Sequence, residues 1–591
     1  MTPPATDARA LWRDIALFTA QGAVIGAAAD MSQSFVWSLV HPAVQALNPH
    51  RVWMAAPVNA LLLLPVLTVL AYVVRGLGRP GDVRRVLRAT AYVFAAAQPL
   101  VFFSRRLGSI SVVILAVGIG LQCARIVERR RWDSILQRLT ATIAAATLGW
   151  GLLVPVYHRV QYQRAIASLP ETRRDQPNVL LLILDTVGAR DMSLYGYERR
   201  TTPTLDSLAH HAIVFDRAIA PAPWTLPSHA SMFTGWRADS LETRYRVPLG
   251  PERRLVSEEF ASAGYRTGGF VANVEYAGTG SGLGRGFHKY VDFGPSWRAA
   301  LSSTATGRFL YTVVNRRRER PLVAGRKSAP RINQQFLEWH QGMRGRPWFA
   351  FLNYYDVHDP YVPPRDDERR FLAEGQQPVY DIGDVEPTDA AAIASARALY
   401  DAALFSLDRA IGELLHELRR RGDLERTVVV ITSDHGEEWG EQGVLMHGNS
   451  VYIASLHVPL MIVLPGASPS ERRVTHSVGT QRLAATLLAL AGLPTANVIG
   501  EPLITEWENA GEQSEPAAIV SWVEQAIRQR KSYPASRSAL YSVVDDSGQV
   551  IIGADTTAYD IWSSAKVLPK LQLGGQGGDY LQRALRRIRG P

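Results

Sequence analysis

The chain has 591 residues, a formal net charge of +10 and one cysteine, Cys123. It is longer than one ordinary domain, and a single cysteine excludes both an intrachain disulfide and a multi-cysteine metal site. The positive charge does not indicate a nucleic-acid partner. Much of the arginine excess lies in short loops between apolar segments, where membrane topology explains it.

The mean hydropathy is close to zero, but it averages two unlike parts. The first 160 residues contain five apolar stretches with almost no charge inside them, each near the ~20 residues that a ~30 Å hydrocarbon core requires. Buried core helices rarely follow one another five times, and a cleavable signal peptide explains only one stretch. The sequence therefore predicts transmembrane spans at residues 15–40, 52–74, 89–104, 107–124 and 139–157.

Two arginine clusters predict the orientation of these spans. By the positive-inside rule, both clustered loops face the cytoplasm, which places the N-terminus inside and everything after Tyr157 outside. We expect an integral protein of a bacterial inner or plasma membrane with its large C-terminal part outside the cytoplasm. Arg105 and Arg106 would then lie in a short external loop, and a miscount of one span would move the large domain inside. The clusters are Arg75, Arg79, Arg84, Arg85 and Arg88, and Arg125, Arg129, Arg130, Arg131 and Arg138.

Beyond the spans, strand and helix patterns alternate, which is typical of an α/β domain. Residues 299–330 and 365–390 indicate loops or insertions on the sheet. Residues 539–562 predict a small antiparallel sheet. We divide the chain into a transmembrane domain of about five helices, a linker, an α/β domain with a mostly parallel sheet flanked by helices, and a C-terminal subdomain with a tail, at residues 1–160, 161–176, 177–505 and 506–591.

Three buried strands, each followed by polar groups, are predicted at residues 178–185, 348–358 and 427–434. Ligands of open α/β sheets bind beyond the carboxyl ends of the strands. Asp185, His358 and Asp434 are therefore expected to converge on one site.

Apolar residues from Tyr400 to Leu418 recur at three- and four-residue spacing, and the pattern ends in a cationic turn followed by Gly422. This predicts an amphipathic helix whose role is packing. Asp401 and Asp408 on this helix are interpreted as solvated or capping residues without a catalytic role.

The segment Pro223–Gly235 carries a candidate nucleophile. Pro227 suits a first helical position and Gly235 a helix stop, so Thr225 is placed just ahead of a helix N-terminus. There, backbone N–H groups and the positive dipole end favour an alkoxide and a bound oxyanion. From this segment alone, a simple N-cap role for Thr225 is an open alternative.

The pair Asp434-His435 opens a glycine-punctuated loop after the third buried strand, and His447 follows within it. Adjacent Asp and His side chains at a strand end can bind one cation. Lone histidines in loops usually carry no function, but their occurrence with Asp185 and Thr225 at strand ends and helix starts favours one site.

With these residues in place, residues 177–500 resemble the sulfatase branch of the alkaline phosphatase superfamily. The resemblance implies an alkaline-phosphatase-like sheet and an ester-cleaving enzyme. The resemblance covers this domain and does not extend to the five predicted spans. The matching motifs, in order, are Leu181–Asp185 with Arg190-Asp191, Tyr195-Gly196, Thr202–Asp206 with Leu208-Ala209, Pro223–Gly235, Gly286-Phe287, His358–Pro364, Ser433–Glu437, Val458-Pro459 and Pro465-Gly466.

The chain departs from the family at several points. Sulfatases carry a C/S-x-P-x-R signature whose first residue becomes formylglycine, whereas the equivalents here are Thr225 and His229. Threonine cannot become formylglycine, so none is expected. The usual Asp-Asp pair is Asp185-Thr186, and the G-K-x-H segment is not recognisable around residues 264–276.

A threonine nucleophile with Asp-His and a later Met-His-Gly is similar to lipoteichoic acid synthases and phosphoethanolamine transferases. Those enzymes also have several spans and an external catalytic domain, although their first metal ligand is usually Glu. By resemblance, Asp185, Asp434, His435 and the Thr225 oxygen bind one divalent cation. Mixed oxygen and imidazole ligands suit Zn²⁺ or Mn²⁺ better than Ca²⁺.

The resemblance also implies a covalent Thr225 ester as an intermediate. His358 and His447 would bind the oxygens of the ester and protonate the leaving group, roles that require pKa values near the ordinary ~6.5. Water or an acceptor alcohol could resolve the intermediate.

Three hypotheses follow. The first is a phosphoryl-ester transferase or phosphodiesterase acting on an envelope lipid or glycan, which Thr225 and the membrane anchor favour. The second is a sulfuric ester hydrolase without formylglycine, which the motif set favours. The third is a non-catalytic membrane scaffold, which the intact set of site residues opposes. The expected partners are the lipid bilayer and a phospho- or sulfo-ester, with no nucleic acid, and the oligomeric state stays open.

Overall fold

The protein is described from a computed structural model. The described residues are 5–40, 50–103, 107–173, 175–294, 296–316, 318–323, 326–341, 345–466, 472–508, 518–526, 530–546, 548–553, 558–563 and 566–568. They form two compact units. The helical unit holds the N-terminal helices together with a later segment, residues 293–325, and the sheet unit holds most of the rest. Arg105 and Arg106 lie outside the described residues.

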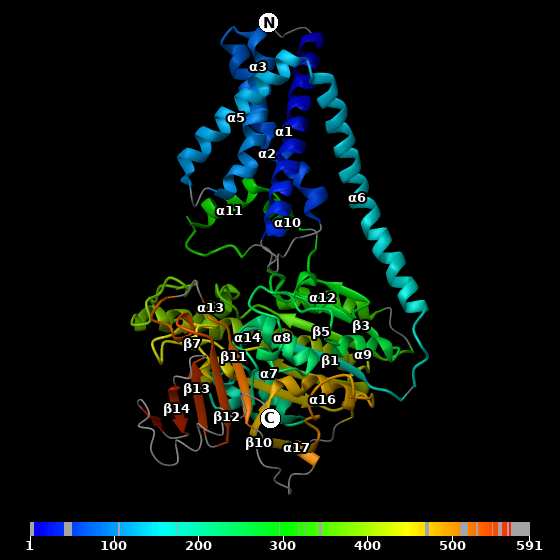
Figure 1. The fold of residues 1–591 in the computed structure, drawn as a ribbon, viewed down its shortest axis with the longest axis vertical. Coiled ribbons are helices and arrows are strands. Elements are labelled where there is room, and N and C mark those ends of the chain that lie inside the picture. Colours follow the sequence, from blue (N-terminus) through cyan, green and yellow to red (C-terminus); the bar gives the residue numbers. More distant parts are fainter. Residues whose placement is uncertain are drawn as a thin grey trace. The chain divides into compact units, whose positions relative to one another are not determined.

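Five long helices occupy the N-terminal region, at the places where the sequence predicts spans (Figure 1). Helix α1 packs against α2 and α3, and α3 packs against α5. A Cβ on Gly120 of α5 would lie 2.4 Å from the Val93 Cα of α3, so the absence of a side chain allows this close crossing. The helices are α1 (Ala5–Val40), α2 (Arg51–Gly76), α3 (Val83–Leu100), α5 (Ser109–Arg130) and α6 (Asp133–Ala167).

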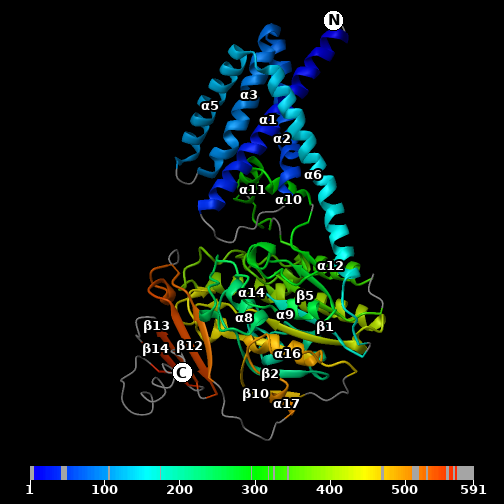
Figure 2. The same cartoon turned by 45° about the vertical axis from the view of Figure 1, so that its right-hand side comes forward.

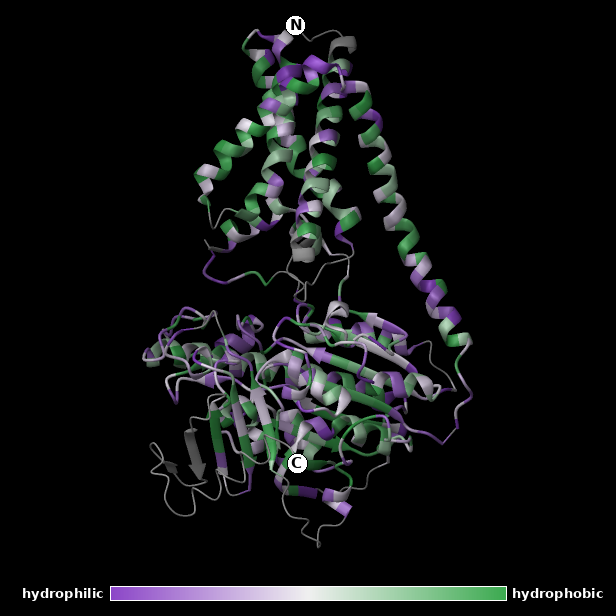
Figure 3. Cartoon of the chain, in the orientation of Figure 1, coloured by the Kyte–Doolittle hydropathy of each residue, from purple (hydrophilic) through white to green (hydrophobic). Residues whose placement is uncertain are grey.

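These five helices are each long and apolar enough to cross a membrane. Large apolar side chains on α5 and α6 are exposed, including Ile110, Ile114, Leu152 and Leu153. The hydrophobic colouring runs along much of α5 and the middle of α6, whereas the C-terminal part of α6 is largely hydrophilic (Figure 3). Exposed apolar surface of this extent suits lipid better than water. A sixth helix that meets the same length and composition criteria, α14 (Ala390–Arg420), packs against other helices of the sheet unit.

The two ends of the helical unit differ in their polar contacts. Near the start of α3, Arg84 and Arg88 form ion pairs with Asp133, and Arg85 pairs with Glu128. These pairs join the two arginine-rich loops of the sequence. The opposite end of α3 carries Gln98, which is buried.

Residues 299–330 differ from the expectation of loops or insertions on the sheet. They include α10 (Trp297–Ser302) and α11 (Ala305–Arg316), and both belong to the helical unit. Helix α10 contacts α2, whereas α11 contacts α3 and the short turn η2 (Val101–Phe103) (Figure 2). Helix α11 forms because apolar residues recur at helical spacing from Phe309 to Val314, a pattern obscured by the surrounding arginines.

The sheet unit is built on an eight-stranded sheet with the order β10-β2-β9-β6-β1-β5-β3-β4. Among these described strands only β9 runs antiparallel to its neighbours, which confirms the predicted mostly parallel sheet. The strands are β1 (Asn178–Leu184), β2 (Ile213–Ile219), β3 (Arg266–Val271), β4 (Lys289–Val291), β5 (Trp348–Tyr354), β6 (Thr427–Ser433), β9 (His457–Val463) and β10 (Arg472–Gly479).

Helices cover both faces of this sheet. On one face, Phe349 of β5 stacks on Phe260 of α9 (Val256–Ser262), with ring centroids 4.4 Å apart. On the other, Phe270 of β3 contacts Phe336 of α12. The central strands are consequently buried along their whole length. The remaining helices are α7 (Pro203–Ala209), α8 (Thr225–Thr234), α12 (Ala329–His340), α13 (Arg365–Phe371), α15 (Ile453–Leu456), α16 (Leu483–Leu490) and α17 (Thr505–Glu508).

Two smaller antiparallel sheets complete the unit. The larger has five strands and follows the order of the sequence, which confirms the small C-terminal sheet predicted from residues 539–562. Its strands are β11 (Ile519–Val523), β12 (Leu540–Asp545), β13 (Gly548–Gly553), β14 (Ala558–Ser563) and β15 (Lys566–Leu568). The smaller pairs β7 (Glu438–Trp439) with β8 (Leu445–Met446), within the loop that follows β6.

Helix α14 begins ten residues before the predicted apolar pattern and has a packing role, as expected. Its two acids are buried, although the sequence suggested solvated or capping positions. Asp401 binds Arg199 at 2.7 Å. Asp408 accepts hydrogen bonds from the backbone N–H groups of Thr204 and Leu205, at 2.8 and 2.9 Å, and so caps the first turn of α7.

We expect Asp408→Ala to lower the free energy of unfolding by about 1–2 kcal/mol, because two backbone donors at a helix start lose their acceptor. Thermal unfolding of the full chain in detergent measures this as a lower midpoint. Glu413→Ala, at an exposed position of the same helix, is the matched control and should stay within about 0.5 kcal/mol of wild type. Equal midpoints for the two variants would contradict the capping role.

Candidate active site with a carboxylate and histidine cluster

The parallel register of the central strands brings the predicted acids together. Strand β1 lies between β5 and β6 and is parallel to both, so Leu184 is level with Ser433. Asp185 and Asp434 are the next residues on the two strands. Thr186 donates its backbone N–H to Asp434 Oδ1 at 3.1 Å. This hydrogen bond holds the Asp434 carboxylate, which follows β6, against the backbone that follows β1.

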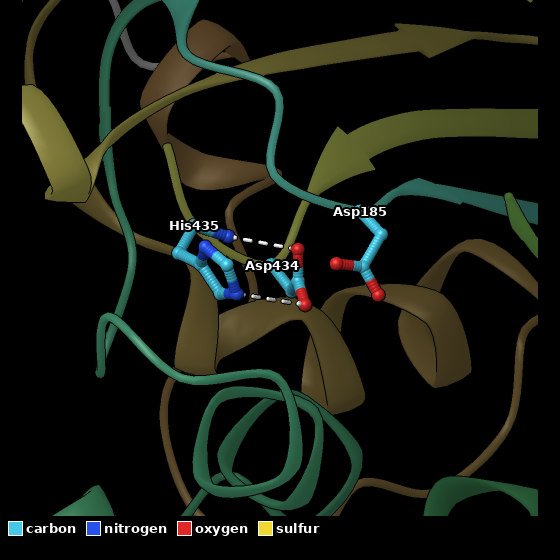
Figure 4. A group of neighbouring side chains, drawn as sticks. All are labelled: Asp185, Asp434 and His435. Carbon is cyan, nitrogen blue, oxygen red and sulfur yellow. Dashed lines mark hydrogen bonds and ion pairs between the residues drawn. The ribbon is translucent and has the colours of Figure 1, made fainter. Parts of the chain in front are cut away.

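Asp185, Asp434 and His435 form a group that could hold a metal ion, since one ligand atom from each lies within 4.8 Å of the other two. Figure 4 shows the two carboxylates side by side with the imidazole next to them. All three residues are buried. Carboxylate oxygens with an imidazole nitrogen are a donor set that divalent transition metals accept, so the residues fit the predicted cation.

The electrostatics of the pair also suit a cation. Burial, together with the charge of Asp434, raises the pKa of Asp185 to about 7. Burial raises the pKa of Asp434 to about 7 as well, although backbone hydrogen bonds and the Thr225 hydroxyl oppose this. Two adjacent buried carboxylates resist ionisation, and a bound cation removes that penalty.

Thr225 is the first residue of α8, two positions earlier than the expected start at Pro227, and the helix ends at Gly235 as predicted. The N-cap is Trp224, and no side chain forms a cap hydrogen bond there. The alternative role of Thr225 as a simple N-cap is therefore not supported. Its Oγ1 lies 3.4 Å from His435 Nε2, and the residue is buried.

The histidines lie close together around Thr225. The rings of His435 and His447 stack with centroids 4.4 Å apart, and His358 meets His447 edge-on at 5.0 Å. His435 donates its Nδ1–H to the Gly436 carbonyl at 3.1 Å, which leaves Nε2 as the nitrogen facing Thr225. The structure thus gathers the six residues singled out in the sequence.

Neighbouring residues fix the other two rings. His358 donates its Nδ1–H to the Asp359 carbonyl at 2.7 Å, and its ring packs on Tyr355 with centroids 4.3 Å apart. His447 Nδ1 hydrogen-bonds Glu437 Oε1 at 3.0 Å, and Glu437 Oε2 accepts from the Tyr361 hydroxyl at 2.9 Å. Glu437 is thus a further site residue that the sequence analysis did not single out, although it stands inside the Ser433–Glu437 motif.

The expectation that His358 and His447 have pKa values near the ordinary value is wrong for the protein without substrate. Burial lowers the pKa of His435 and of His447 to about 4, and burial with the nearby His447 holds the pKa of His358 well below its usual range. Loss of hydration disfavours the charged imidazolium, and sequence gives no measure of that burial. The three rings are neutral, and their Nε2 atoms accept protons or ligands.

Asn273 was missed in the sequence. It follows β3, which is parallel to β5, so its side chain reaches the same edge of the sheet. Its Nδ2 donates to Asp185 Oδ2 at 2.8 Å and lies 3.4 Å from Thr225 Oγ1. A polar residue two positions after a buried strand was the available signal, but the segment lacked the G-K-x-H motif expected there.

Comparisons with known proteins assign the chain to a family. The family model named Sulfatase matches residues 177–493. The chain belongs to the sulfatase family. The matched residues cover β1 to α16 and include all six predicted site residues, which confirms the family inferred from the motifs.

Two curated relatives are sulfatases. Arylsulfatase A of Homo sapiens is 27% identical over 361 residues, a match that covers 54% of this chain and 65% of that protein. Arylsulfatase K of Bos taurus is 26% identical over 378 residues, covering 56% of this chain and 65% of that protein. The chain thus spans 65% of the length of these relatives.

Solved structures share the fold at lower identity. A phosphonate monoester hydrolase from Silicibacter pomeroyi matches with a TM-score of 0.54 and 22% identity, over 70% of this chain and 94% of that one. The phosphonate monoester hydrolase of Agrobacterium radiobacter matches with a TM-score of 0.53 and 19% identity, over the same shares of the two chains. These matches confirm the fold class of the sheet unit.

We expect a divalent cation to stabilise the protein more at pH 8 than at pH 5. The folded-state pKa values of Asp185 and Asp434, about 7, exceed the ordinary carboxyl value, so the metal-free protein loses stability as pH rises from ~4 through ~7. A cation replaces the lost protons and reverses this loss. Thermal midpoints with Zn²⁺ or Mn²⁺ and with a chelator, at both pH values, measure the difference.

Asp434→Asn is the control for this experiment. It removes one of the two charges, so the chelator-treated variant should lose less stability between pH 5 and pH 8 than wild type does. Its cation-dependent shift should also shrink or vanish. A shift as large as that of wild type would place the cation elsewhere.

Proposed function

We propose that the protein is a membrane-bound, metal-dependent enzyme that cleaves or transfers a phosphoryl or sulfuryl ester through a covalent Thr225 intermediate. The observation that carries the proposal is the Thr225 hydroxyl, buried at a helix start beside Asp434 and His435. A structural threonine does not need two unneutralised carboxylates around it. An ester substrate on an envelope lipid or glycan is favoured because the helical unit offers five candidate spans.

Asp185, Asp434, His435 and the Thr225 oxygen are the residues that would hold one divalent cation, with Zn²⁺ or Mn²⁺ suiting the imidazole better than Ca²⁺. When bound, the cation lowers the pKa of the Thr225 hydroxyl and polarises the ester oxygen. The Asn273 amide holds Asp185 in place. No formylglycine is required, because Thr225 itself supplies the attacking oxygen.

Thr225 Oγ1 gives up its proton to solvent and attacks phosphorus or sulfur, and the bond from that atom to the leaving-group oxygen breaks as this oxygen takes a proton from His358 or His447. The start of α8 favours the negative charge that develops there. Water or an acceptor alcohol then takes the group from Thr225, which gives a hydrolase in the first case and a transferase in the second.

His358 and His447 are proposed to bind the ester oxygens and to serve the leaving group. Their Nδ1 atoms are committed to the Asp359 carbonyl and to Glu437, so Nε2 is the atom that gains or loses a proton. An anionic ester next to these rings raises their pKa values, which burial alone holds low. Each ring thus becomes an acid only with substrate present.

The second candidate is a sulfuric ester hydrolase. It is favoured by the similarity to arylsulfatases and opposed by the threonine at the position of the formylglycine precursor.

The third candidate, a non-catalytic scaffold, is opposed by the compact cluster of Asp185, Asp434, His435 and Thr225. The named phosphonate monoester hydrolases support phosphorus chemistry on this fold.

We expect Thr225→Ala to reduce turnover by at least ~10²-fold, because the variant lacks the attacking oxygen. The assay offers a phosphodiester and a sulfate ester side by side to the purified, metal-loaded protein. Whichever ester wild type cleaves identifies phosphorus or sulfur as the reacting centre. Thr225→Ser keeps a hydroxyl and should retain far more activity than Thr225→Ala.

Bound metal is measured in the same samples, so that loss of cation is separated from loss of the nucleophile. Mass spectrometry of acid-quenched wild type should detect the ester on the peptide that contains Thr225. Turnover that survives Thr225→Ala unchanged would rule out this nucleophile, while a wild-type protein inactive on both esters would favour the scaffold.

For the localisation, we expect the chain after α6 to lie outside the cytoplasm. A phosphatase reporter that folds only outside should be active when fused after Ser168, just past α6. The same reporter fused after Arg131, in the arginine-rich loop between α5 and α6, should be inactive. The reverse pattern would place the catalytic domain in the cytoplasm.

A further inference from the structure

Helix α11 has an apolar side that no described residue fully covers. Phe309, Leu310 and Val314 lie on one side of the helix and are 42%, 39% and 45% exposed. Arg308 and Thr312 lie on the other side, since successive residues are ~100° apart around a helix axis. An exposed apolar side of this kind on a short helix indicates a partner surface.

The polar side of α11 is bound to the helical unit through Asp30 of α1. Asp30 is 2% exposed. Its carboxylate pairs with Arg308 at 2.9 Å and Arg51 at 2.6 Å, and it accepts the backbone N–H of Ala305 at 3.1 Å. An acid inside an apolar span is costly unless it is paired, so these contacts explain why the span tolerates Asp30.

Two further contacts fix the segment at the same end of the unit. Arg51, at the start of α2, donates from Nε to the Ser303 carbonyl at 2.9 Å. Gln98, near the end of α3, hydrogen-bonds Thr306 through both its amide oxygen and its amide nitrogen. This is the end of α3 opposite to the arginine-rich loops, and therefore the outer end if those loops face the cytoplasm.

We propose that α11 is an interfacial helix whose side formed by Phe309, Leu310 and Val314 lies in the lipid at the outer surface of the membrane that holds the spans. The inference rests on the membrane location proposed above. It adds to the five spans a second mode of lipid contact, made by a segment that the chain inserts between β4 and α12 of the sheet unit.

A lipid occupant is favoured over a protein by continuity. Helix α11 contacts α3 and η2, so its apolar side continues the apolar surface at the end of a candidate span. Arg318, two positions after the end of the helix, is exposed and suits anionic headgroups at that depth. The helix is too short to span a bilayer, which leaves a position parallel to its surface.

The test uses the single native cysteine. Cys123 on α5 is exposed, and wild type labelled there with a nitrobenzoxadiazole fluorophore reports on the spans. In a Cys123→Ser background, Leu310→Cys and Thr312→Cys place the same label on opposite sides of α11. The full chain is reconstituted in phosphatidylcholine and phosphatidylglycerol vesicles, and each label is exposed to doxyl-lipid and to iodide.

We expect doxyl-lipid to quench the label at position 310 at least roughly threefold more than the label at 312, and iodide to show the opposite preference. Thr312→Cys is the matched control, because both positions are exposed on the same helix. Thermal midpoints equal to wild type establish that both variants are folded.

Three results would overturn the proposal. Iodide quenching at both positions places α11 in water. Shielding of position 310 from both quenchers means that a protein or a second copy covers the helix. Equal lipid quenching at 310 and 312 shows immersion on all sides. A Cys123 label that doxyl-lipid does not quench contradicts the membrane location itself, so the two failures are distinguishable.

Discussion

The site depends on one unfavourable contact, the juxtaposition of two buried carboxylates at the ends of β1 and β6. Asp185 and Asp434 are 1% and 0% exposed, and hydrogen bonds from Asn273 and from the Thr186 backbone hold them in place. Each raises the cost of ionising the other. The buried parallel sheet supplies the stability that this pair of carboxylates lacks. Its register holds the two strand ends level, because a shift by one residue would turn every side chain of a strand to the other face. A cation bound as proposed above would remove this repulsion.

Backbone geometry reflects the same constraint. Three described non-glycine residues have positive φ, and two of them, Thr186 at 66° and Met446 at 67°, directly adjoin site residues. β-Branched threonine rarely adopts this conformation. At position 186 it turns the chain sharply after Asp185, so that the Thr186 N–H faces Asp434. Strain that persists beside a polar cluster is typical of functional sites.

Much of this organisation could be predicted from the sequence. Asp185 and Asp434 each follow a buried strand. Because a parallel sheet brings the carboxyl ends of its strands to one edge, these two acids were recognisable without coordinates. Asn273 was not, because a single amide after a strand has no distinctive pattern. The low histidine pKa values also depend on burial, which no local motif encodes. The separation into transmembrane, linker, catalytic and C-terminal segments stays a prediction.

The structure of residues 293–325 is difficult to predict from the sequence, because their partners lie some 200 residues or more away along the chain, as with Arg308 and Asp30. Arginine-rich surroundings make the segment look like a solvated loop, whereas Arg308 is paired with Asp30 and the apolar residues Phe309, Leu310 and Val314 form one side of α11.

This segment has a practical consequence for protein engineering. A soluble catalytic fragment cannot be obtained by deleting the N-terminal helices alone, because α11 would remain with its apolar side exposed and Arg308 without Asp30. The two stems of the insertion, however, lie close together, since Lys327 Nζ donates to the Val291 carbonyl at 2.7 Å. A short glycine-containing bridge from Asp292 to Arg326 would therefore remove the insertion with little change to the sheet. Arg326 must be kept, because its guanidinium binds the carbonyls of Asp359 and Pro360 next to His358.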